Sequence, residues 1–408
     1  MLSRKRVEGE SNRRVNFDVV IVGGGLPGAS LAATLAGSGL KLALIERRRP
    51  AVALSGWDSR VFALTPASLA FLESAGAWAR IEPARVTPIY DMRVFGDDGR
   101  SHLDFSAYES GALQLAATVE SSRLQHALWQ GLERQDNLAL LCPAAPAELR
   151  RENGCVEIHL EDGKVMAAKL VVGADGADSW VRRTAGIDTE AGSYAQRGIV
   201  ANFACARPHR NIAYQWFRRD GVLACLPLPD RRVSIVWSAP EAHARALLAL
   251  PPDAFCRRVA EAGGEVLGDL ELITAPLAFP LSRMIAERIG VGRVALVGDA
   301  AHVVHPLAGQ GANLGLGDAH SLSELLRGAP DPGDQLLLRR FERARAEDIL
   351  ALRWTTDALA RLFASDNRLA ARFRNLGLNL TNSVPVLKTF LSRRAIAVGG
   401  GLHRKETP

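Results

Sequence analysis

The amino-acid sequence predicts an α/β fold in which a Rossmann-like domain is interleaved with a β-sheet domain and followed by C-terminal helices. Three observations support this prediction. A strand–turn–helix–strand pattern covers residues 17–46, short strand-like runs dominate residues 197–280, and a helical pattern extends over residues 336–363. The length of 408 residues suits two or three domains, or one large interrupted domain.

The composition excludes several classes of protein. Hydrophobic residues make up 48% and charged residues 23% of the chain, as in globular rather than disordered proteins. The five cysteines are scattered without a C-x-x-C pair, which argues against zinc ribbons, disulfide scaffolds and dithiol reductases. Residues 1–16 lack the apolar segment of a secretory signal, so we expect a flexible basic tail there. The longest charge-free run, residues 19–40, contains six glycines and Pro27 and predicts a strand and a turn rather than a membrane helix.

The elements predicted along the chain begin with a βαβ unit. Its parts are a buried strand at residues 17–22, a glycine-rich turn at 23–28, a helix at 29–36 and a strand at 42–45. The patterns that follow are a helical region at 62–79, a hairpin at 93–104, a helix at 119–132 and strands at 156–160 and 165–172. The β-rich block comprises strands at 199–205, 213–217, 222–226 and 233–237, with helices at 241–250 and 253–262. The last predicted elements are a strand at 293–297 and helices at 310–326 and 336–363.

The first chemical motif is the glycine-rich turn of the βαβ unit. Gly23, Gly25 and Gly28 have the G-x-G-x-x-G spacing of a dinucleotide site. The first glycine permits the tight turn, the second lets the backbone approach a pyrophosphate, and the third lets the helix pack on the strand. Glu46 ends the next strand, where a carboxylate can accept hydrogen bonds from ribose hydroxyls. The sequence contains one such fingerprint, which predicts one firmly bound dinucleotide.

Two further motifs follow buried strands. The strand at 165–172 leads to Asp175-Gly176, which alone would indicate only a loop. The strand at 293–297 leads to Gly298-Asp299, where a carboxylate could meet a ligand hydroxyl, and a glycine-rich loop at 306–311 then opens a helix. His302 and His305 lack a nearby Cys or Glu that would complete a metal site. We therefore expect both histidines either to support the side chains of a neighbouring site or to pack in the core, and predict no metal.

These three motifs, in this order and at these spacings, resemble the single-component flavoprotein aromatic hydroxylases, which share the para-hydroxybenzoate hydroxylase fold. A narrower similarity, to the ubiquinone-biosynthesis hydroxylases, extends from about residue 17 to residue 397. It is carried by residues 58–68 (DSRVFALTPAS), 305–318 (HPLAGQGANLGLGD) and 374–378 (RNLGL). The implied organisation is a tail at 1–16, an FAD-binding domain at 17–87, 116–190 and 286–330, a β-rich substrate domain at 88–115 and 191–285, and a C-terminal helical region at 331–408.

The resemblance also implies the roles of individual residues. Gly23, Gly25, Gly28 and Glu46 would hold the ADP half of a tightly but non-covalently bound FAD. The other residues implied to contact FAD are Arg47, Arg60, Arg123, Asp175, Gly176, Gly298, Asp299, Gly311, Ala312 and Asn313. Asp175-Gly176 would also serve NAD(P)H, the transient reductant. Pro306, Gly309 and Gln310 would form the wall beside the reacting part of the flavin, and no general base is assigned.

The leading hypothesis is an FAD-dependent monooxygenase that hydroxylates the aromatic ring of a polyprenylated phenol in ubiquinone biosynthesis, with NAD(P)H and O2. The flavin supplies the redox chemistry, which explains why the sequence shows no nucleophile triad or carboxylate pair. Three alternatives stay open. One is a monooxygenase of a soluble aromatic or polyketide, another is a flavin-dependent prenyl reductase that consumes no O2, and the third is a non-enzymatic partner in a biosynthetic complex.

The net charge of +6 is unevenly distributed. Residues 1–16 contain five basic and two acidic residues (+3), and residues 331–408 contain fourteen and eight (+6), which leaves −3 for residues 17–330. Residues 358–408 mix nine basic and two acidic residues with large apolar ones. They suit a helix pair packed on the FAD domain. Our hypothesis adds peripheral binding to the inner face of the cytoplasmic membrane, near other quinone-biosynthesis proteins, which salt-sensitive binding to anionic liposomes would test. Because the positive charge lies outside the motif-bearing body, we expect a cytoplasmic protein with no nucleic-acid partner.

Overall fold

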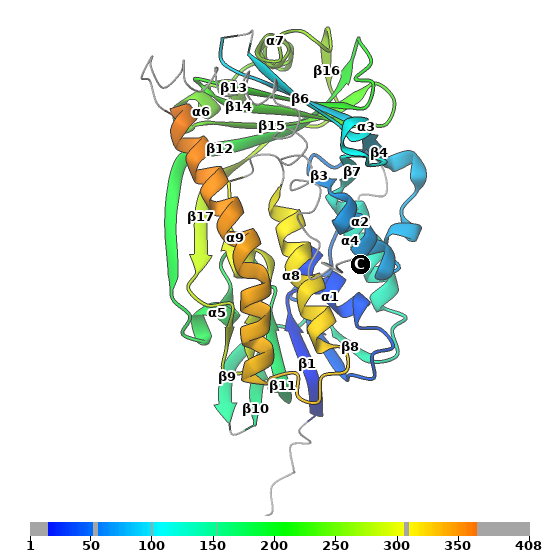
Figure 1. The fold of residues 1–408 in the computed structure, drawn as a ribbon, viewed down its shortest axis with the longest axis vertical. Helices are drawn as coiled ribbons and strands as arrows, with labels where there is room; N and C mark the ends of the chain where they lie inside the picture. Colours follow the sequence, from blue (N-terminus) through cyan, green and yellow to red (C-terminus); the bar gives the residue numbers. More distant parts are fainter. Residues whose placement is uncertain (1–14, 52–55, 99–100, 153, 306–309, 365–408) are drawn as a thin grey trace, which may run out of the picture.

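The structure is a computed structural model that describes residues 15–51, 56–98, 101–152, 154–305 and 310–364. An eight-stranded sheet lies in the lower part of the molecule and a nine-stranded sheet in the upper part (Figure 1). A three-stranded sheet lies between them on one side. This architecture confirms the predicted α/β fold. The basic tail at 1–14 and residues 365–408, most of the segment for which we hypothesise membrane binding, lie outside the described residues.

The lower sheet is built around a parallel core. Its order is β18-β19-β11-β1-β2-β8, and β19, β11, β1, β2 and β8 pair in parallel. The strands are β1 (Val15–Val22), β2 (Leu42–Ile45), β8 (Leu138–Leu141), β11 (Val165–Gly173), β18 (Gly290–Val291) and β19 (Val294–Leu296), with β9 (Pro146–Glu152) and β10 (Cys155–Leu160) extending β11. Parallel pairing brings the carboxyl ends of β1, β2, β11 and β19 to one edge, which is the edge that carries the predicted motifs.

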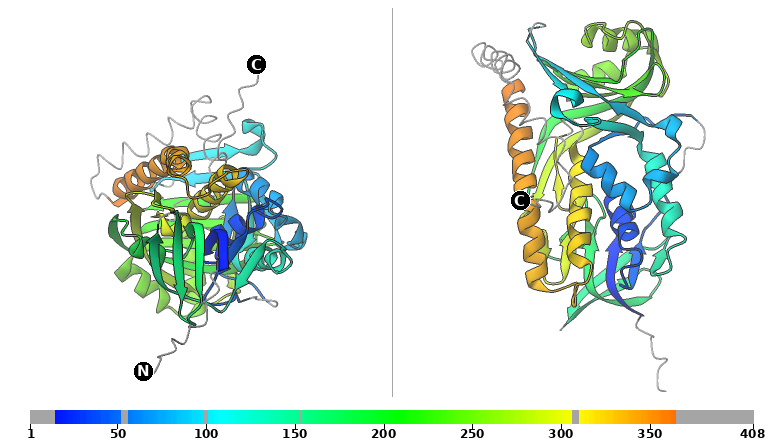
Figure 2. Two further views of the ribbon diagram at one scale, coloured as in Figure 1. Left: turned by 90° about the horizontal axis from the view of Figure 1, so that it is seen from below. Right: turned by 45° about the vertical axis from the view of Figure 1, so that its right-hand side comes forward.

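Helices cover the lower sheet. α1 (Leu26–Thr34) packs between α4 (Ser121–Leu132) and α8 (Gln310–Leu326), as the right-hand view of Figure 2 shows. α1 corresponds to the helix predicted at 29–36. It begins three residues earlier than predicted, at Leu26, because Pro27 suits the first turn of a helix. The predicted helix at 310–326 is confirmed with the same bounds.

The upper sheet has the order β20-β17-β12-β15-β14-β13-β5-β6, with β16 paired to β12. Its strands are β5 (Asp91–Phe95), β6 (His102–Ser106), β12 (Thr189–Cys205), β13 (Ile212–Arg218), β14 (Gly221–Leu228), β15 (Arg232–Pro240), β16 (Leu270–Leu272), β17 (Leu277–Ala286) and β20 (His302–Val303). α6 (Glu241–Leu248) and α7 (Pro252–Ala262) cover its outer face, where Phe203, Trp216 and Trp237 share a core with Phe255 of α7. The predicted strands and helices of this β-rich block are confirmed.

The small sheet corrects two predictions. β3 (Val61–Leu64) and β4 (Thr87–Ile89) both pair with β7 (Ala116–Glu120). The helix predicted at 62–79 is wrong at its start, because Phe62-Ala63-Leu64 is a strand and α2 (Pro66–Ser74) begins only after Thr65. The Thr65 hydroxyl accepts a hydrogen bond from the amide of Ser68 and so caps this helix. The helix predicted at 119–132 is α4, which begins two residues later than predicted, at Ser121. Val119 and Glu120 are the last residues of β7.

Five short elements complete the described chain. They are the single turns η1 (Trp78–Arg80), η2 (Pro83–Arg85) and η3 (Gly298–Ala300), and the short helices α3 (Ala107–Ser110) and α5 (Trp180–Thr184).

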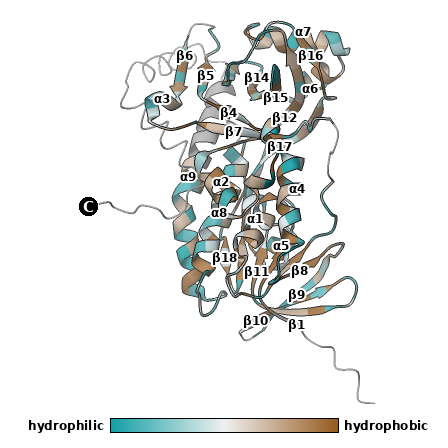
Figure 3. Cartoon of the chain, turned by 90° about the vertical axis from the view of Figure 1, so that its right-hand side faces the viewer, coloured by the Kyte–Doolittle hydropathy of each residue, from teal (hydrophilic) through white to brown (hydrophobic). Residues whose placement is uncertain are grey.

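The long helix α9 (Gln335–Ala364) is fixed to the lower domain by a buried ion pair. It carries both hydrophilic and hydrophobic residues (Figure 3), and Leu338, Phe341 and Arg345 form part of its buried stripe. Arg345 Nε donates to Asp318 Oδ1 of α8 at 2.8 Å, and Asp318 Oδ2 lies 2.6 Å from His302 Nε2. These three side chains are at most 2% exposed. The contact confirms the packing role predicted for His302. None of the described helices is both long enough and apolar enough to cross a membrane.

Replacing Arg345 with Met should lower the free energy of unfolding by about 3–5 kcal/mol, because the substitution leaves the buried Asp318 carboxylate without its arginine. Arg340→Met is the matched control, since Arg340 lies on the same helix with an exposed side chain. Chemical denaturation of the two variants measures the difference. Equal losses from both would contradict the importance of the buried pair.

Candidate cofactor site at the carboxyl edge of the parallel sheet

The turn between β1 and α1 is shaped by close backbone packing. Gly23 has a φ of +106°, and a Cβ there would lie 2.8 Å from the amide nitrogen of Asp175. A Cβ on Gly28 would collide with the carbonyl group of Gly23. A Cβ on Gly25, by contrast, would have no atom within 4 Å. Gly23 and Gly28 are therefore required by the fold, whereas the space in front of Gly25 is open to a ligand.

The three sequence motifs meet at this turn. The first touches the second where Gly23 lies against Ala174 and Asp175. It touches the third where a Cβ on Gly298 would lie 2.7 Å from Cγ of Pro27. The second and third are joined by Arg182, whose Nη1 donates to the carbonyl oxygen of Ala300 at 2.8 Å. Motifs separated by more than a hundred residues in sequence thus form a single site.

Asp299 has the properties of a ligand-binding carboxylate. Its side chain is exposed, yet surrounding protein atoms raise its pKa, an effect that the charges of His302 and Arg60 oppose. The carboxylate is thus flanked by protein while solvent still reaches it. Within the described part of the chain it makes no hydrogen bond. The predicted residues Arg60 and Asp299 are therefore close enough to interact electrostatically.

The start of α8 supplies a second polar group without a partner. The Oε1 atom of Gln310 is buried and accepts no hydrogen bond from the described residues. A Cβ on Gly311 would have only Val304 Cγ2 near it, at 3.9 Å, and Ala312 is half-buried against the core. The amide groups of this helix start can therefore be approached by a ligand. Pro306 and Gly309, predicted beside the flavin, lie outside the described residues.

Asn313 is placed differently from the other residues of this helix start. Its side chain is fully buried, and its Nδ2 donates to the carbonyl oxygen of Ala63 at 2.9 Å. Its Oδ1 accepts from the amide of Thr65, also at 2.9 Å. Asn313 therefore ties α8 to the β3–α2 connection, a structural role that the sequence motif does not reveal. The predicted contact with the cofactor stays a prediction.

Glu46 shapes the glycine-rich turn from the next strand. Its Oε2 accepts from the amide of Gly24 at 2.7 Å, and its Oε1 accepts from the amide of Arg48 at 3.0 Å. Each oxygen keeps a free lone pair, so binding of a ribose is compatible with these bonds. Arg47 is exposed, with its guanidinium 3.8 Å from the carboxylate of Glu161. Both residues thus lie at the expected edge of the sheet.

The Asp175 carboxylate is directed into its own loop. Its Oδ1 accepts from the Ser179 hydroxyl at 2.6 Å, and its Oδ2 accepts from the amide of Val181 at 3.1 Å. These bonds shape the start of α5. The open surface of this motif is instead at Gly176, where φ is +83° and a Cβ would meet nothing within 4 Å.

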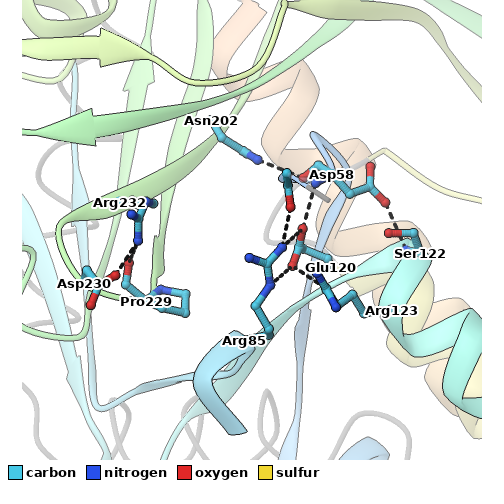
Figure 4. Close-up of polar contacts among 10 residues, drawn as sticks. Asp58, Arg85, Glu120, Ser122, Arg123, Asn202, Pro229, Asp230 and Arg232 are labelled. Atoms are coloured by element: carbon cyan, nitrogen blue, oxygen red, sulfur yellow. Dashed lines mark hydrogen bonds and ion pairs between the residues drawn. The ribbon is translucent and has the colours of Figure 1, made fainter. Parts of the chain in front are cut away.

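Sequence reasoning missed several residues that complete the site. Trp129 of α4 donates from Nε1 to the carbonyl oxygen of Gly24 at 2.9 Å, and its ring leaves no space for a side chain on Gly24. Figure 4 shows Glu120 with Arg85 and the predicted residue Arg123 both directed at it. The sequence places Glu120 three residues before the predicted residue Arg123, and residues at this spacing are neighbours at a helix start, so this contact can be read from the sequence, whereas those of Arg85 and Trp129 cannot.

The inner face of the upper sheet carries an apolar strip flanked by small polar side chains, Ser234 and Ser238, on the neighbouring strand. Side chains alternate between the faces of a strand, so residues between those of the outer core point inward. The inward residues Val222, Ala224, Leu226 and Val236 are aliphatic or small and are only half-buried. Asn202 shares this face and donates from Nδ2 to the carbonyl oxygen of Asp58 at 2.8 Å. The apolar strip therefore faces the segment that leads to Arg60.

These observations fit a ligand with a pyrophosphate and a chain of hydroxyl groups. The open space at Gly25 has room for a phosphate, and the Asp299 carboxylate and Gln310 Oε1, which accept no hydrogen bond from the described residues, are able to accept hydroxyl or amide donors. Among the described residues, no group of three His, Cys, Asp or Glu side chains could hold a metal ion.

Comparisons with known proteins identify the ligand. The model of the FAD-binding domain family matches residues 16–350. Ubiquinone hydroxylase UbiL of Rhodospirillum rubrum is 38% identical over 386 residues, which cover 93% of this chain and 89% of that protein. The chain belongs to the family of FAD-dependent ubiquinone hydroxylases. This hydroxylase is therefore an FAD-dependent oxidoreductase, and FAD has the pyrophosphate and hydroxyl-bearing chain that the site fits.

Two further proteins illustrate the similarity. The 3-demethoxyubiquinol 3-hydroxylase of Escherichia coli is 36% identical over 392 residues, or 94% of this hydroxylase and 98% of that enzyme. Among solved structures, PqsL of Pseudomonas aeruginosa in complex with 2-aminobenzoylacetate has a TM-score of 0.74 and 26% identity. The match covers 88% of this hydroxylase and 100% of PqsL. These findings confirm the family and fold class predicted from the motifs.

Gly25→Val should separate cofactor binding from folding. Because a side chain at Gly25 has open space and the backbone there is extended, the variant should unfold like the parent yet bind FAD at least about tenfold more weakly. Gly28→Ala is the contrast, and its clash should cost about 1–3 kcal/mol of stability. Thermal unfolding and FAD fluorescence titration measure the two effects. Tight FAD binding by Gly25→Val would rule out the assigned pyrophosphate position.

Proposed function

We propose that this protein hydroxylates the aromatic ring of a polyprenylated phenol in ubiquinone biosynthesis, with NAD(P)H and O2 as co-substrates. The observation that carries the proposal is the half-buried apolar strip of Val222, Ala224, Leu226 and Val236, on the same sheet face from which Asn202 contacts the segment before Arg60. An aliphatic surface of this kind suits a substrate with an isoprenoid chain. The names of the two relatives, a ubiquinone hydroxylase and a 3-demethoxyubiquinol 3-hydroxylase, support the same substrate class.

The proposed assignment of cofactor residues follows the geometry of the site. Gly23, Gly25 and Gly28 would receive the ADP half, and Asp299 and Gln310 would face the hydroxyl-bearing chain and the ring. When bound, FAD supplies the redox chemistry that activates O2, with NAD(P)H as the reductant typical of the family. The protein itself orients the phenol on the apolar sheet face and excludes water from the reacting ring.

The test is an assay of the purified holoenzyme with NAD(P)H, O2 and a prenylated phenol. We expect O2 uptake together with a product heavier by one oxygen atom, detected by mass spectrometry. Saturation of the prenyl chain without O2 uptake would show a prenyl reductase instead. Hydroxylation of small soluble aromatics with no turnover of prenylated ones would contradict the proposed substrate class.

The apolar strip can be tested separately. Ala224→Asp places a charge on the inner face of β14 and should raise KM for the prenylated phenol about tenfold or more, because an isolated charge is poorly accommodated against an apolar chain. FAD affinity should stay unchanged. Leu248→Asp on the outer helix α6 is the matched control. If the two variants change KM equally, the strip does not bind the substrate.

A further inference from the structure

Glu120 is a buried carboxylate at the junction of three elements. It ends β7, immediately before α4, and its side chain is 1% exposed. Its Oε1 accepts from the amide of Asp58 at 2.7 Å and from Arg85 Nη2 at 3.0 Å. Its Oε2 accepts from Arg85 Nε at 2.9 Å and forms an ion pair with Arg123 Nε at 3.5 Å (Figure 4). One carboxylate thus binds two arginines and the backbone.

The two arginines are satisfied to different degrees. Arg85 donates twice to Glu120 and once to the carbonyl oxygen of Gly56 at 2.6 Å, and its guanidinium lies 3.8 Å from the centre of the Trp57 ring. Arg123 forms only the ion pair with Glu120, and its buried Nε lacks a hydrogen bond in the described part of the chain. The guanidinium of Arg123 is therefore held near Glu120 at its inner end, and within the described part of the chain its outer nitrogens make no hydrogen bond.

Arg123 lies at the end of α4 that contacts the segment leading to Arg60. Trp129 of the same helix contacts Gly24 in the glycine-rich turn. Arg123 lies six residues earlier, about 9 Å along the helix axis toward the upper sheet and about 120° around it from Trp129. Its end of α4 is fixed there because the amide of Ser122 donates to Asp58 Oδ2 at 3.0 Å. Asp58 also accepts the amide of Arg60 at 2.9 Å, so both predicted cofactor arginines depend on one segment.

We infer that Glu120 is a positioning residue for FAD binding, which acts by holding the Arg123 guanidinium at the wall of the cofactor site. The carboxylate limits the rotamers of a long side chain, so less conformational entropy is lost when the ligand binds. The inference concerns the cofactor alone. The role of Glu120 in FAD binding would stand even if the protein did not act on a prenylated phenol.

A double-mutant cycle on the full-length chain tests the inference, with FAD affinity measured by flavin fluorescence. Glu120→Gln and Arg123→Met should each raise the dissociation constant for FAD about tenfold. If Glu120 acts through Arg123, the double variant should also lose about tenfold rather than about a hundredfold. If Glu120→Gln does not fold, Glu120→Asp, which keeps the charge but shortens the side chain, takes its place in the double-mutant cycle.

Asp331→Asn is the matched control for loss of a structural carboxylate. Asp331 accepts two hydrogen bonds from Arg293 and one from the amide of Gly333, at the opposite end of β19 from Asp299. This variant should lower the melting temperature without changing FAD affinity. The inference is overturned if the losses in the Glu120 and Arg123 variants multiply, if either single variant binds FAD normally, or if Asp331→Asn weakens FAD binding equally.

Discussion

The close approach of three backbone segments at the end of β1 is the constraint on which the rest of the structure depends. Gly23 lies against the loop that follows β11, and Gly28 lies against the carbonyl group of Gly23. A side chain at Gly23 would push the turn away from the loop after β11, and one at Gly28 would push α1 away from the turn. Because β1 is central in the parallel sheet, this packing also sets where the ends of β11, β2 and β19 meet. The cofactor site is thus a consequence of backbone packing before any ligand binds.

Buried ion pairs join the outer elements to this centre. Asp318 binds His302, Arg345 and the amide of Gly298, and so links α8 and α9 to the turn that carries Asp299. Glu120 has the same function on the other side of the site, where it links β7, α4 and the segment at Asp58. In both places a carboxylate accepts a backbone amide and an arginine, which offsets the cost of burying its charge. The two networks fix polar turns that the apolar core alone would not orient.

The sequence predicts the parts of the structure that are governed by local geometry. The glycine spacing, the strand before Asp299 and the helix from Gln310 were predicted correctly because each depends on a short pattern with a physical cause. The strand at Val61–Leu64 was missed because a short apolar run does not distinguish a strand from a helix. The functions of Asn313 and Trp129 were also missed, since their partners lie 250 and 105 residues away in sequence. The inward direction of the Asp175 carboxylate is a further tertiary feature that the Asp-Gly pattern cannot show.

The central claim is that FAD lies across the edge where the three motifs meet, and a crystal structure of the holoenzyme tests it most directly. We expect the pyrophosphate at the open face of Gly25, the hydroxyl-bearing chain within hydrogen-bond distance of Asp299, and the Arg123 guanidinium in contact with the cofactor while still paired with Glu120. A pyrophosphate bound away from Gly25, or a cofactor that leaves Asp299 without a contact, would contradict the account.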